Sequence, residues 1–192
     1  NNGAALQGSA EMTSGENIDL ASLALPECQK RLITELKKFQ KPLIGIVIAG
    51  RPHLLSEVSA AFDALLFAGY PGQFGGSALA RILFGETNPS GKLAVSIPDE
   101  NGQLPVYYNY REAAFQRDYT DCSGTPRYGF GYGLSYAEFM LKGIHAQYAP
   151  QAIQINGTIE NLSAIAGAEV VQVYLRNYSQ QVLPRVKVLC GF

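Results

Sequence analysis

The 192-residue sequence contains no tryptophan, only three cysteines and no run of basic residues. The cysteines, Cys28, Cys122 and Cys190, are odd in number and far apart, and none belongs to a Cys-x-x-Cys pair. We therefore expect unpaired thiols rather than a disulfide framework or a zinc site. With 15 Lys and Arg against 16 Asp and Glu, the chain has no field that would attract nucleic acid or an anionic membrane.

Long apolar runs are also missing. The longest, residues 42–49, falls well short of the ~20 residues that a membrane-spanning helix needs, and it suits a buried strand instead. Residues 1–9 lack the basic and apolar regions of a signal peptide. In a fragment this absence leaves periplasmic, secreted and cytoplasmic locations open, so the sequence assigns no compartment.

In its first half the sequence alternates helical and strand patterns. The apolar, β-branched run 42–49 is typical of a strand covered on both faces. Helices are predicted over residues 26–39, 54–62 and 77–84, and strands over residues 42–49, 64–68 and 92–97. This alternation indicates an α/β layer with a mainly parallel sheet and helices on both of its faces.

The second half has a different composition. Residues 99–136 are rich in Tyr, Gly and Pro, and we expect an ordered connection there, because its aromatic residues would not be left in water. Strands are then predicted over residues 139–148, 152–161, 169–177 and 185–189, with a bulge at Asn156-Gly157. Such strands suggest a β-sandwich, but four are too few to close one, so this unit is expected to be incomplete.

A series of short motifs runs along the chain in a fixed order. They are Ser14-Gly15-Glu16, Leu23-Ala24-Leu25-Pro26, Ala49-Gly50-Arg51-Pro52, Tyr70-Pro71-Gly72-Gln73, Leu83-Phe84-Gly85, Asn88-Pro89-Ser90-Gly91, Gly102-Gln103-Leu104-Pro105, Phe130-Gly131-Tyr132-Gly133-Leu134-Ser135-Tyr136 and Glu169-Val170-Val171-Gln172. From about residue 12 to residue 192, this series resembles the second and third domains of family 3 glycoside hydrolases, of the β-glucosidase and β-xylosidase type.

The resemblance implies a fold and a missing partner. It implies a layered α/β sandwich in residues 1–110, an ordered connection in residues 111–136 and a truncated fibronectin type III-like β-sandwich in residues 137–192. In such enzymes an N-terminal (β/α) barrel precedes these domains. The sequence shows no trace of the barrel, which we therefore expect to be the partner of this chain.

The resemblance also implies a catalytic residue. Retaining glycosidases use two carboxyl groups about 5–5.5 Å apart, one as nucleophile and one as acid/base. In this family the nucleophilic Asp belongs to the barrel, and Glu16 matches the acid/base Glu through its setting in Ser14-Gly15-Glu16. The glycine lets the backbone turn sharply beside a sugar. The nearby Glu11 lacks a flanking glycine, and Asp19 is expected to hold the loop.

The other candidate features are expected to be structural. The glycine-rich stretch 69–76 fits neither phosphate-binding glycine pattern, and we predict a turn that lies against the barrel. Relatives often carry Trp near Tyr70, and the lack of Trp here weakens the case for an aromatic sugar platform. Arg51 is expected to form structural hydrogen bonds. His53 and His145 stand alone, so neither a metal site nor a cofactor is expected.

The favoured function is that of an enzyme fragment. The intact parent would be an exo-acting, retaining hydrolase of β-linked glucosides or xylosides, and its partner would be a β-linked oligosaccharide or glycoside. This chain alone is expected to be inactive, because half of the carboxylate pair is missing. The alternative is a non-catalytic carbohydrate-binding or structural module built from the same two folds. The preferred sugar, the linkage and the oligomeric state stay open.

Overall fold

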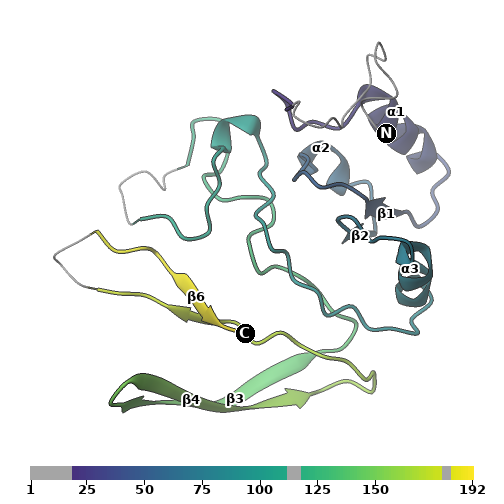
Figure 1. Cartoon of the computed structure of the whole chain (residues 1–192). Coiled ribbons are helices and arrows are strands. Elements are labelled where there is room, and N and C mark those ends of the chain that lie inside the picture. The colour runs from purple at the N-terminus through teal and green to yellow at the C-terminus, as the bar shows by residue number, and fades with distance from the viewer. Residues whose placement is uncertain (1–18, 112–117, 179–182) are drawn as a thin grey trace.

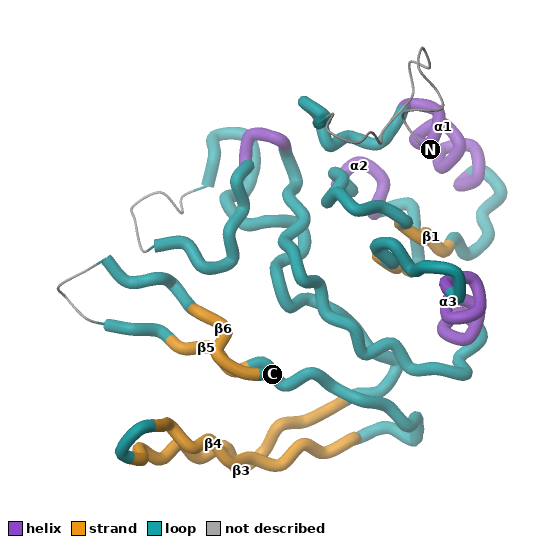
Figure 2. The backbone as a smooth tube through the Cα atoms, in the orientation of Figure 1, coloured by secondary structure: helices purple, strands orange, loops and turns teal. Residues whose placement is uncertain are grey.

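The computed structural model describes residues 19–111, 118–178 and 183–192. Within these residues, three helices and a small parallel sheet lie together in one region, and two antiparallel strand pairs lie in another (Figure 1). Loops form most of the chain between the two regions, interrupted by one short 3-10 helix, η2 (Asn101–Gln103), as the tube in Figure 2 shows.

The first region contains all of the predicted helices and two of the predicted strands. Its elements are α1 (Glu27–Lys37), β1 (Ile44–Val47), α2 (Ser56–Ser59), β2 (Ala64–Phe67) and α3 (Gly75–Leu83). Strands β1 and β2 pair in parallel, with Ile44 opposite Ala64 and Val47 opposite Phe67. The predicted alternation of helices and strands is thus confirmed, as is the parallel pairing of the strands. Among the described residues this sheet has two strands.

Local sequence explains where the longer helices begin and end. Pro26 is the N-cap of α1, where its missing N–H costs no intrahelical hydrogen bond. Glu27 in the first turn and Lys37 in the last turn complement the helix dipole. Helix α3 ends at Leu83, and Gly85, just beyond its C-cap Phe84, has a φ of 76°, in the left-handed region that glycine adopts readily.

A small apolar core lies against one face of the β1–β2 pair. Leu55, Val58 and Ile97 are 1–5% exposed and form its centre. Side chains from α1, both strands and the later loops pack around them: Leu25, Ile33, Val47, Phe62, Leu65, Phe67, Leu93 and Tyr128. Gly45 faces the same side, where an added Cβ would lie 2.7 Å from Leu65 Cδ1, so a larger residue would displace the Leu65 side chain from the core.

The opposite face of β1 is open, and the prediction of a strand covered on both faces is wrong for the described fold. Ile44, Ile46 and Ile48 are 49%, 37% and 59% exposed. Successive side chains of a strand point to opposite faces, so these three share the side away from the core. Helices α1 and α2 place Ile33 and Val58 in the core, and thus on the other side of the strand pair.

Residues 92–97 form no regular strand, although their alternation predicted one. Ile97 instead makes an isolated antiparallel bridge with Tyr128, through N–H···O contacts of 2.8 and 3.2 Å. Further along, Leu93 N–H donates to Tyr132 O at 2.8 Å, and Gly131 N–H donates to Leu93 O at 2.7 Å. Residues 93 and 97 thus pair with backbone groups 31 to 39 positions later in the sequence. These hydrogen bonds hold residues 128–132 of the connection to the first region.

A buried glutamine orders the loop after this stretch. Gln103 is 6% exposed, and its Oε1 accepts hydrogen bonds from the backbone N–H groups of Asp99 (2.6 Å) and Glu100 (3.2 Å). Its Nε2 donates to the carbonyls of Ser123 (2.7 Å) and Thr125 (3.0 Å). One side chain therefore satisfies four backbone groups from two segments, which a buried loop needs.

The second region consists of two separate antiparallel pairs. Strands β3 (Phe139–Ala149) and β4 (Ala152–Asn161) form a long hairpin, and β5 (Val173–Leu175) pairs with β6 (Val188–Gly191). The register of the hairpin shifts between Lys142 and His145, opposite Gly157. A bulge is thus present where predicted, but the extra residue belongs to β3, where Gly143 adopts a φ of 57°.

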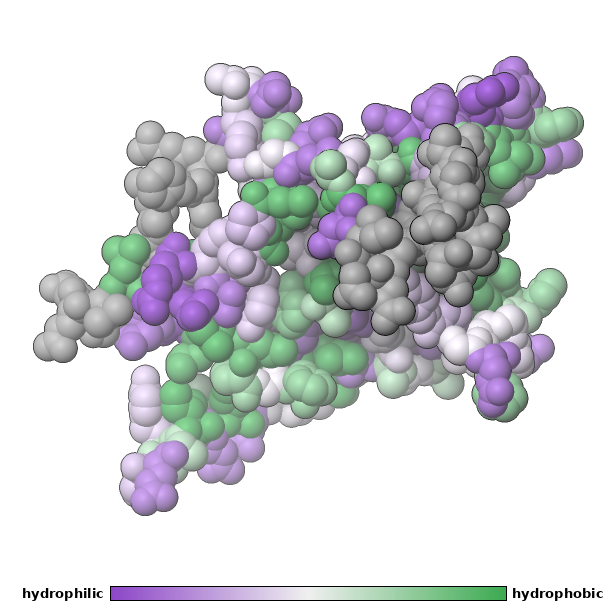
Figure 3. All heavy atoms as spheres, turned by 45° about the horizontal axis from the view of Figure 1, so that its top comes forward, coloured by the Kyte–Doolittle hydropathy of each residue, from purple (hydrophilic) through white to green (hydrophobic). Residues whose placement is uncertain are grey.

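The β3–β4 hairpin has an apolar face and a polar face. The register places Leu141 beside Ile159, and Tyr148 beside Ile153, on one face. Exposure on this apolar face is high: Leu141 45%, Ile144 57%, Tyr148 92%, Ile153 47%, Ile155 45% and Ile159 44%. The other face is polar and carries the Lys142–Glu160 ion pair. Hydrophobic side chains thus reach the surface over much of the molecule, as the space-filling view shows (Figure 3).

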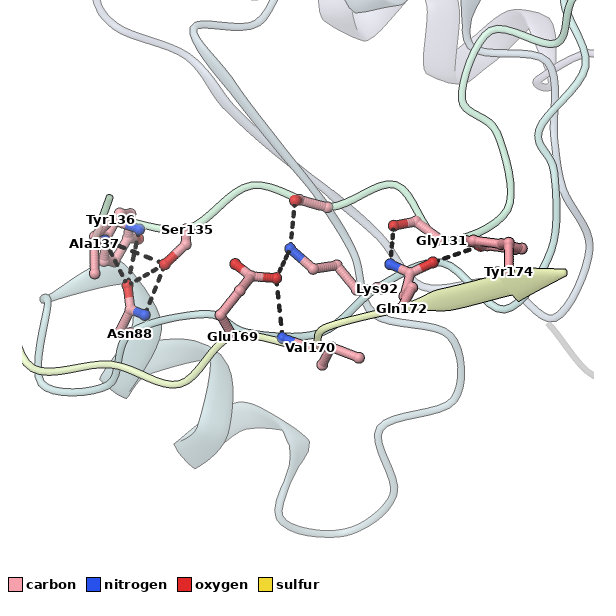
Figure 4. Close-up of polar contacts among 11 residues, drawn as sticks. Asn88, Lys92, Gly131, Ser135, Tyr136, Ala137, Glu169, Val170, Gln172 and Tyr174 are labelled. Atoms are coloured by element: carbon pink, nitrogen blue, oxygen red, sulfur yellow. Dashed lines mark hydrogen bonds and ion pairs between the residues drawn. The ribbon is translucent and has the colours of Figure 1, made fainter. Parts of the chain in front are cut away.

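Three groups of polar contacts, which we call the clasp, hold the second region to the first (Figure 4). The first centres on Asn88, just after α3, whose Oδ1 accepts from Tyr136 N–H (2.8 Å) and Ala137 N–H (3.2 Å). Its Nδ2 lies 2.8 Å from Ser135 Oγ. Asn88 therefore satisfies the backbone at the start of the second region.

The other two groups of the clasp join the loops to the segment before β5. Lys92 Nζ lies 2.7 Å from Glu169 Oε1 and 2.9 Å from Gly133 O, and the two charged side chains are only 14% and 21% exposed. Gln172 Nε2 donates to Gly131 O at 2.9 Å, and Tyr174 OH donates to Gln172 Oε1 at 2.6 Å. Partial burial strengthens such contacts, because water screens them less.

We expect Asn88→Ala to lower the free energy of unfolding by about 0.5–1.5 kcal/mol, because it removes the acceptor of Tyr136 N–H and one of the two acceptors of Ala137 N–H, the other being Ser135 Oγ at 3.1 Å. Asn88→Asp keeps an oxygen facing Tyr136 N and Ala137 N and should cost clearly less. Urea unfolding of both variants measures the difference. Equal losses for the two variants would show that the acceptor role of Asn88 is not what stabilises this junction.

Candidate functional site

Parallel strands end at one edge of their sheet, and in open α/β folds ligands bind outside that edge. Strand β1 leads into Gly50, Arg51, Pro52 and His53, and β2 leads into the glycine-rich stretch 69–76. We refer to these two loops, with residues 19–25 that contact them, as the carboxyl edge. It is the part of the described fold where a site is expected.

The two loops of the carboxyl edge pack closely on one another. A Cβ added at Gly50 would lie 2.5 Å from Cε2 of Tyr70, so the tyrosine ring lies directly against the Gly50 backbone. Gly69 and Gly72 have φ values of 59° and 70°, which the turn around Tyr70 requires and which other residues rarely adopt. The predicted glycine-rich turn is thus present, and Tyr70 remains 79% exposed on it.

The segment before α1 is tied to the loop after β1. Arg51 Nη2 lies 3.4 Å from Asp19 Oδ1, with the arginine side chain 27% exposed. Leu23 O accepts from Leu54 N–H at 2.9 Å and lies 3.0 Å from Nδ1 of His53, a contact in which Nδ1 must be the donor. Arg51 and the 7%-exposed His53 therefore have structural contacts, and the Asp19 side chain, which is fully exposed, makes a surface ion pair with Arg51.

Glu16 lies outside the described residues, as do Gly15 and Glu11. The acid/base role of Glu16 therefore stays a prediction. Glu16 precedes Asp19 by three positions, and Asp19 contacts the carboxyl edge. The first described residue after Glu16 is thus in contact with the carboxyl edge.

Other reactive groups do not assemble into a second centre among the described residues. No three His, Cys, Asp or Glu side chains in residues 19–111, 118–178 and 183–192 are arranged to hold a metal ion. Cys122 and Cys190 are free thiols, as expected. Burial raises the pKa of Cys122, and the charges of Asp121 and Glu100 raise it further, so this thiol stays protonated and is a poor nucleophile.

In the described parts of the chain, no helix is long and apolar enough to cross a bilayer.

Two residues that shape the edge and its support are not among the predicted site residues, although Gln103 belongs to the motif Gly102-Gln103-Leu104-Pro105. Asn101 Oδ1 accepts from Leu23 N–H at 2.9 Å, and Gln103 satisfies four backbone groups of the connection. Both belong to the stretch Asn101-Gly102-Gln103, whose composition suggests only a turn. Gln103 caps the local turn through Asp99 and Glu100, but its other partners, Ser123 and Thr125, lie 20 and 22 positions away, and the partner of Asn101 lies 78 positions away. No local pattern could have identified these long-range contacts.

Comparison with known proteins finds a family whose model matches this chain. Residues 4–136 match the glycosyl hydrolase family 3 C-terminal domain. The chain is 33% identical over 204 residues to the periplasmic β-glucosidase of Salmonella typhimurium, covering 98% of this chain and 26% of that protein. It is 36% identical over 194 residues to a β-xylosidase of Formosa agariphila, covering 96% and 27%.

A solved structure of a β-glucosidase is also similar to this chain. A mutant β-glucosidase from Listeria innocua in complex with laminaribiose has a TM-score of 0.86 and 36% identity to this chain, covering 93% of this chain and 27% of that one. The chain thus spans about a quarter of the length of the relatives that it matches.

Proposed function

This chain belongs to the glycosyl hydrolase family 3 C-terminal domain family, and on that premise we propose that it is the C-terminal part of a retaining, exo-acting β-glucosidase or β-xylosidase. Its relatives are about four times as long. In this proposal an N-terminal (β/α) barrel supplies the nucleophilic carboxylate, and the present chain supplies the acid/base carboxylate of Glu16. The substrate is a β-linked glucoside or xyloside.

The chemistry takes place in two steps. The barrel carboxylate attacks the anomeric carbon while Glu16 donates its proton to the leaving oxygen, so that a covalent glycosyl-enzyme forms and the glycosidic bond breaks. Glu16, now a carboxylate, then takes a proton from water, and that water displaces the enzyme carboxylate. Glu16 must therefore be protonated at the start of the reaction, which burial against a sugar and the charge of the nucleophile both favour.

This proposal rests on the contact of Asp19 with Arg51 at the carboxyl edge. Three residues of extended chain reach no further than about 11 Å. Because Asp19 pairs with Arg51, the carboxyl edge is the part of the described fold nearest to Glu16 along the chain. This edge is where α/β folds present reactive groups to ligands.

We propose the finer architecture on the same footing: a layered α/β sandwich in residues 1–110, a connection in residues 111–136 and a fibronectin type III-like unit in residues 137–192. Two apolar faces support it. The outer face of β1 and the apolar face of the β3–β4 hairpin are both exposed, and each is the kind of surface that a further layer covers. In the proposal, parts of the longer protein supply these layers.

We expect this chain alone to show no turnover of aryl β-glucosides or β-xylosides, whereas the full-length protein that contains it should be active. Half of the carboxylate pair belongs to the barrel, and losing one partner removes the reaction path. The measurement is release of the aryl group by each purified protein. Turnover by the isolated chain that survives Glu16→Gln would contradict the proposal and indicate a different site.

A further inference from the structure

The chain contains three Asn-Gly pairs, and two of them lie among the described residues. Asn2-Gly3 lies outside them, Asn101-Gly102 belongs to η2, and Asn156-Gly157 belongs to β4. The side-chain amide of asparagine can react with the backbone nitrogen of the next residue, and glycine obstructs this least because it has no Cβ. The two described pairs share this reactivity, so their surroundings decide which of them reacts.

The side chain of Asn101 is held on both sides. Its Oδ1 accepts a hydrogen bond from Leu23 N–H at 2.9 Å, and its Nδ2 donates to Ser22 Oγ at 3.4 Å. A capping box between Glu100 and Gln103 closes the backbone of the same turn. A reaction at Asn101 would first have to break these contacts, so the folded protein protects this pair.

Asn156 lacks such restraints. Its side chain is exposed, lies on the polar face of the β3–β4 hairpin and has no hydrogen-bond partner among the described residues. Gly157 lies between the register pairs Asn156–His145 and Thr158–Lys142, opposite the bulge, and has no single partner in β3. A bulge disrupts the ladder locally, so the backbone rotates here at a lower cost than in a regular strand.

The polar face is also the face that stays in water. A further layer would cover the apolar face of the hairpin, which carries the exposed Ile153, Ile155 and Ile159. Successive side chains of a strand point to opposite sides, so Asn156 points away from that layer. Its amide therefore remains accessible to water in a longer protein as well.

We propose that Asn156 is a site of spontaneous deamidation. The backbone nitrogen of Gly157 bonds to Cγ of Asn156, the bond from Cγ to Nδ2 breaks, and the displaced group leaves as ammonia with the proton of the attacking nitrogen. Water then opens the resulting succinimide ring at either of its carbonyl carbons, which gives aspartate or isoaspartate. The sum is asparagine and water in, and the acid and ammonia out. Isoaspartate adds a carbon to the main chain of β4 and thereby disturbs its register with β3.

Site-resolved mass spectrometry of the full-length protein tests this proposal. The purified protein is stored at neutral pH, in buffer and in urea, and peptides that separate aspartate from isoaspartate report on Asn101 and Asn156. In buffer we expect Asn156 to convert at least about tenfold faster than Asn101, which reacts only when its contacts open. In urea the two rates should approach one another.

Three results would overturn the proposal. The first is a rate at Asn156 that is no higher than that at Asn101 in the native protein. The second is a ratio that persists in urea, because local sequence and not the fold would then set it. The third is aspartate without isoaspartate at Asn156, which indicates direct hydrolysis of the amide rather than a ring.

Gly157→Ala is the matched variant. An added Cβ would meet nothing nearer than Lys142 O at 3.6 Å, and the φ of Gly157 is not positive, so the fold accommodates alanine. The methyl group crowds the attacking nitrogen, and we expect conversion of Asn156 to slow at least about tenfold. Gly102→Ala, where an added Cβ would meet no atom within 4 Å, is the control and should leave the rate at Asn156 unchanged. An undiminished rate in Gly157→Ala would refute the ring-closing step.

Discussion

Replacing Glu16 by Gln in the full-length protein should lower kcat/KM for β-glucosides or β-xylosides by about 10²- to 10⁴-fold. An amide can neither protonate the leaving oxygen nor accept a proton from water, so both steps of the reaction lose their catalyst. A substrate whose leaving group needs no protonation should retain much of the rate of the first step. With an activated aryl glycoside we therefore expect a burst of aryl release followed by slow turnover, as the glycosyl-enzyme accumulates.

The matched control for this experiment is Glu11→Gln. It makes the same chemical change five positions earlier, at a carboxylate without a flanking glycine. We expect its kcat/KM to stay within about twofold of the original, because the proposal gives Glu11 no part in either proton transfer. Equal losses in the two variants, or no loss in Glu16→Gln, would refute the assignment of the acid/base residue.

Leu55→Ala should destabilise the protein by about 2–5 kcal/mol. Leu55 is 2% exposed and lies at the centre of the core with Val58 and Ile97, so its truncation removes buried surface and leaves a cavity beside the sheet. The core is small, and few neighbouring side chains can move into the gap. Urea unfolding followed by circular dichroism gives the free energy of unfolding of the variant.

Leu134→Ala is the control for this second prediction. Leu134 is 74% exposed, so the same truncation removes little buried surface, and we expect a change within about 0.5 kcal/mol. If Leu55→Ala proved no more destabilising than Leu134→Ala, the cluster around Leu55 would not be the core of the first region.

The sequence predicted the elements of the first region well because each has a strong local pattern. The run 42–49 contains β1, and the stretch 77–84 overlaps most of α3. The patterns could not show what packs on the outer face of β1. A continuous apolar run indicates that both faces are meant to be buried, yet the partner for Ile44, Ile46 and Ile48 is not among the described residues.

Longer-range features were harder to predict. Residues 92–97 alternate like a strand, but their hydrogen-bond partners lie in residues 128–132, which carry no strand pattern. Asn156-Gly157 predicts a bulge in β4, whereas the extra residue lies in the opposite strand, at Gly143. In both cases the outcome depends on which distant backbone comes alongside, and single-sequence patterns do not contain that information.

The candidate site was predictable in part. Arg51 follows a strand end, which predicts structural contacts for its side chain, and the structure shows one of them with Asp19. The expectation that Asp19 holds its loop stays a prediction. The role of Asn101 could not be predicted, because it bonds to Leu23, 78 positions earlier. Glu16 rests on the family resemblance and stays a prediction.

The clasp has a practical consequence for anyone who wishes to shorten this protein. A truncation after residue 136 looks attractive, because regular β structure begins only at Phe139. It would, however, remove Glu169 and Gln172, and with them the ion pair to Lys92 and the hydrogen bond to Gly131 O. The surface of the loops that residues 137–192 cover would also be opened to water. We therefore expect the loops between residues 88 and 136 to unfold more easily in the shortened protein than in the whole chain.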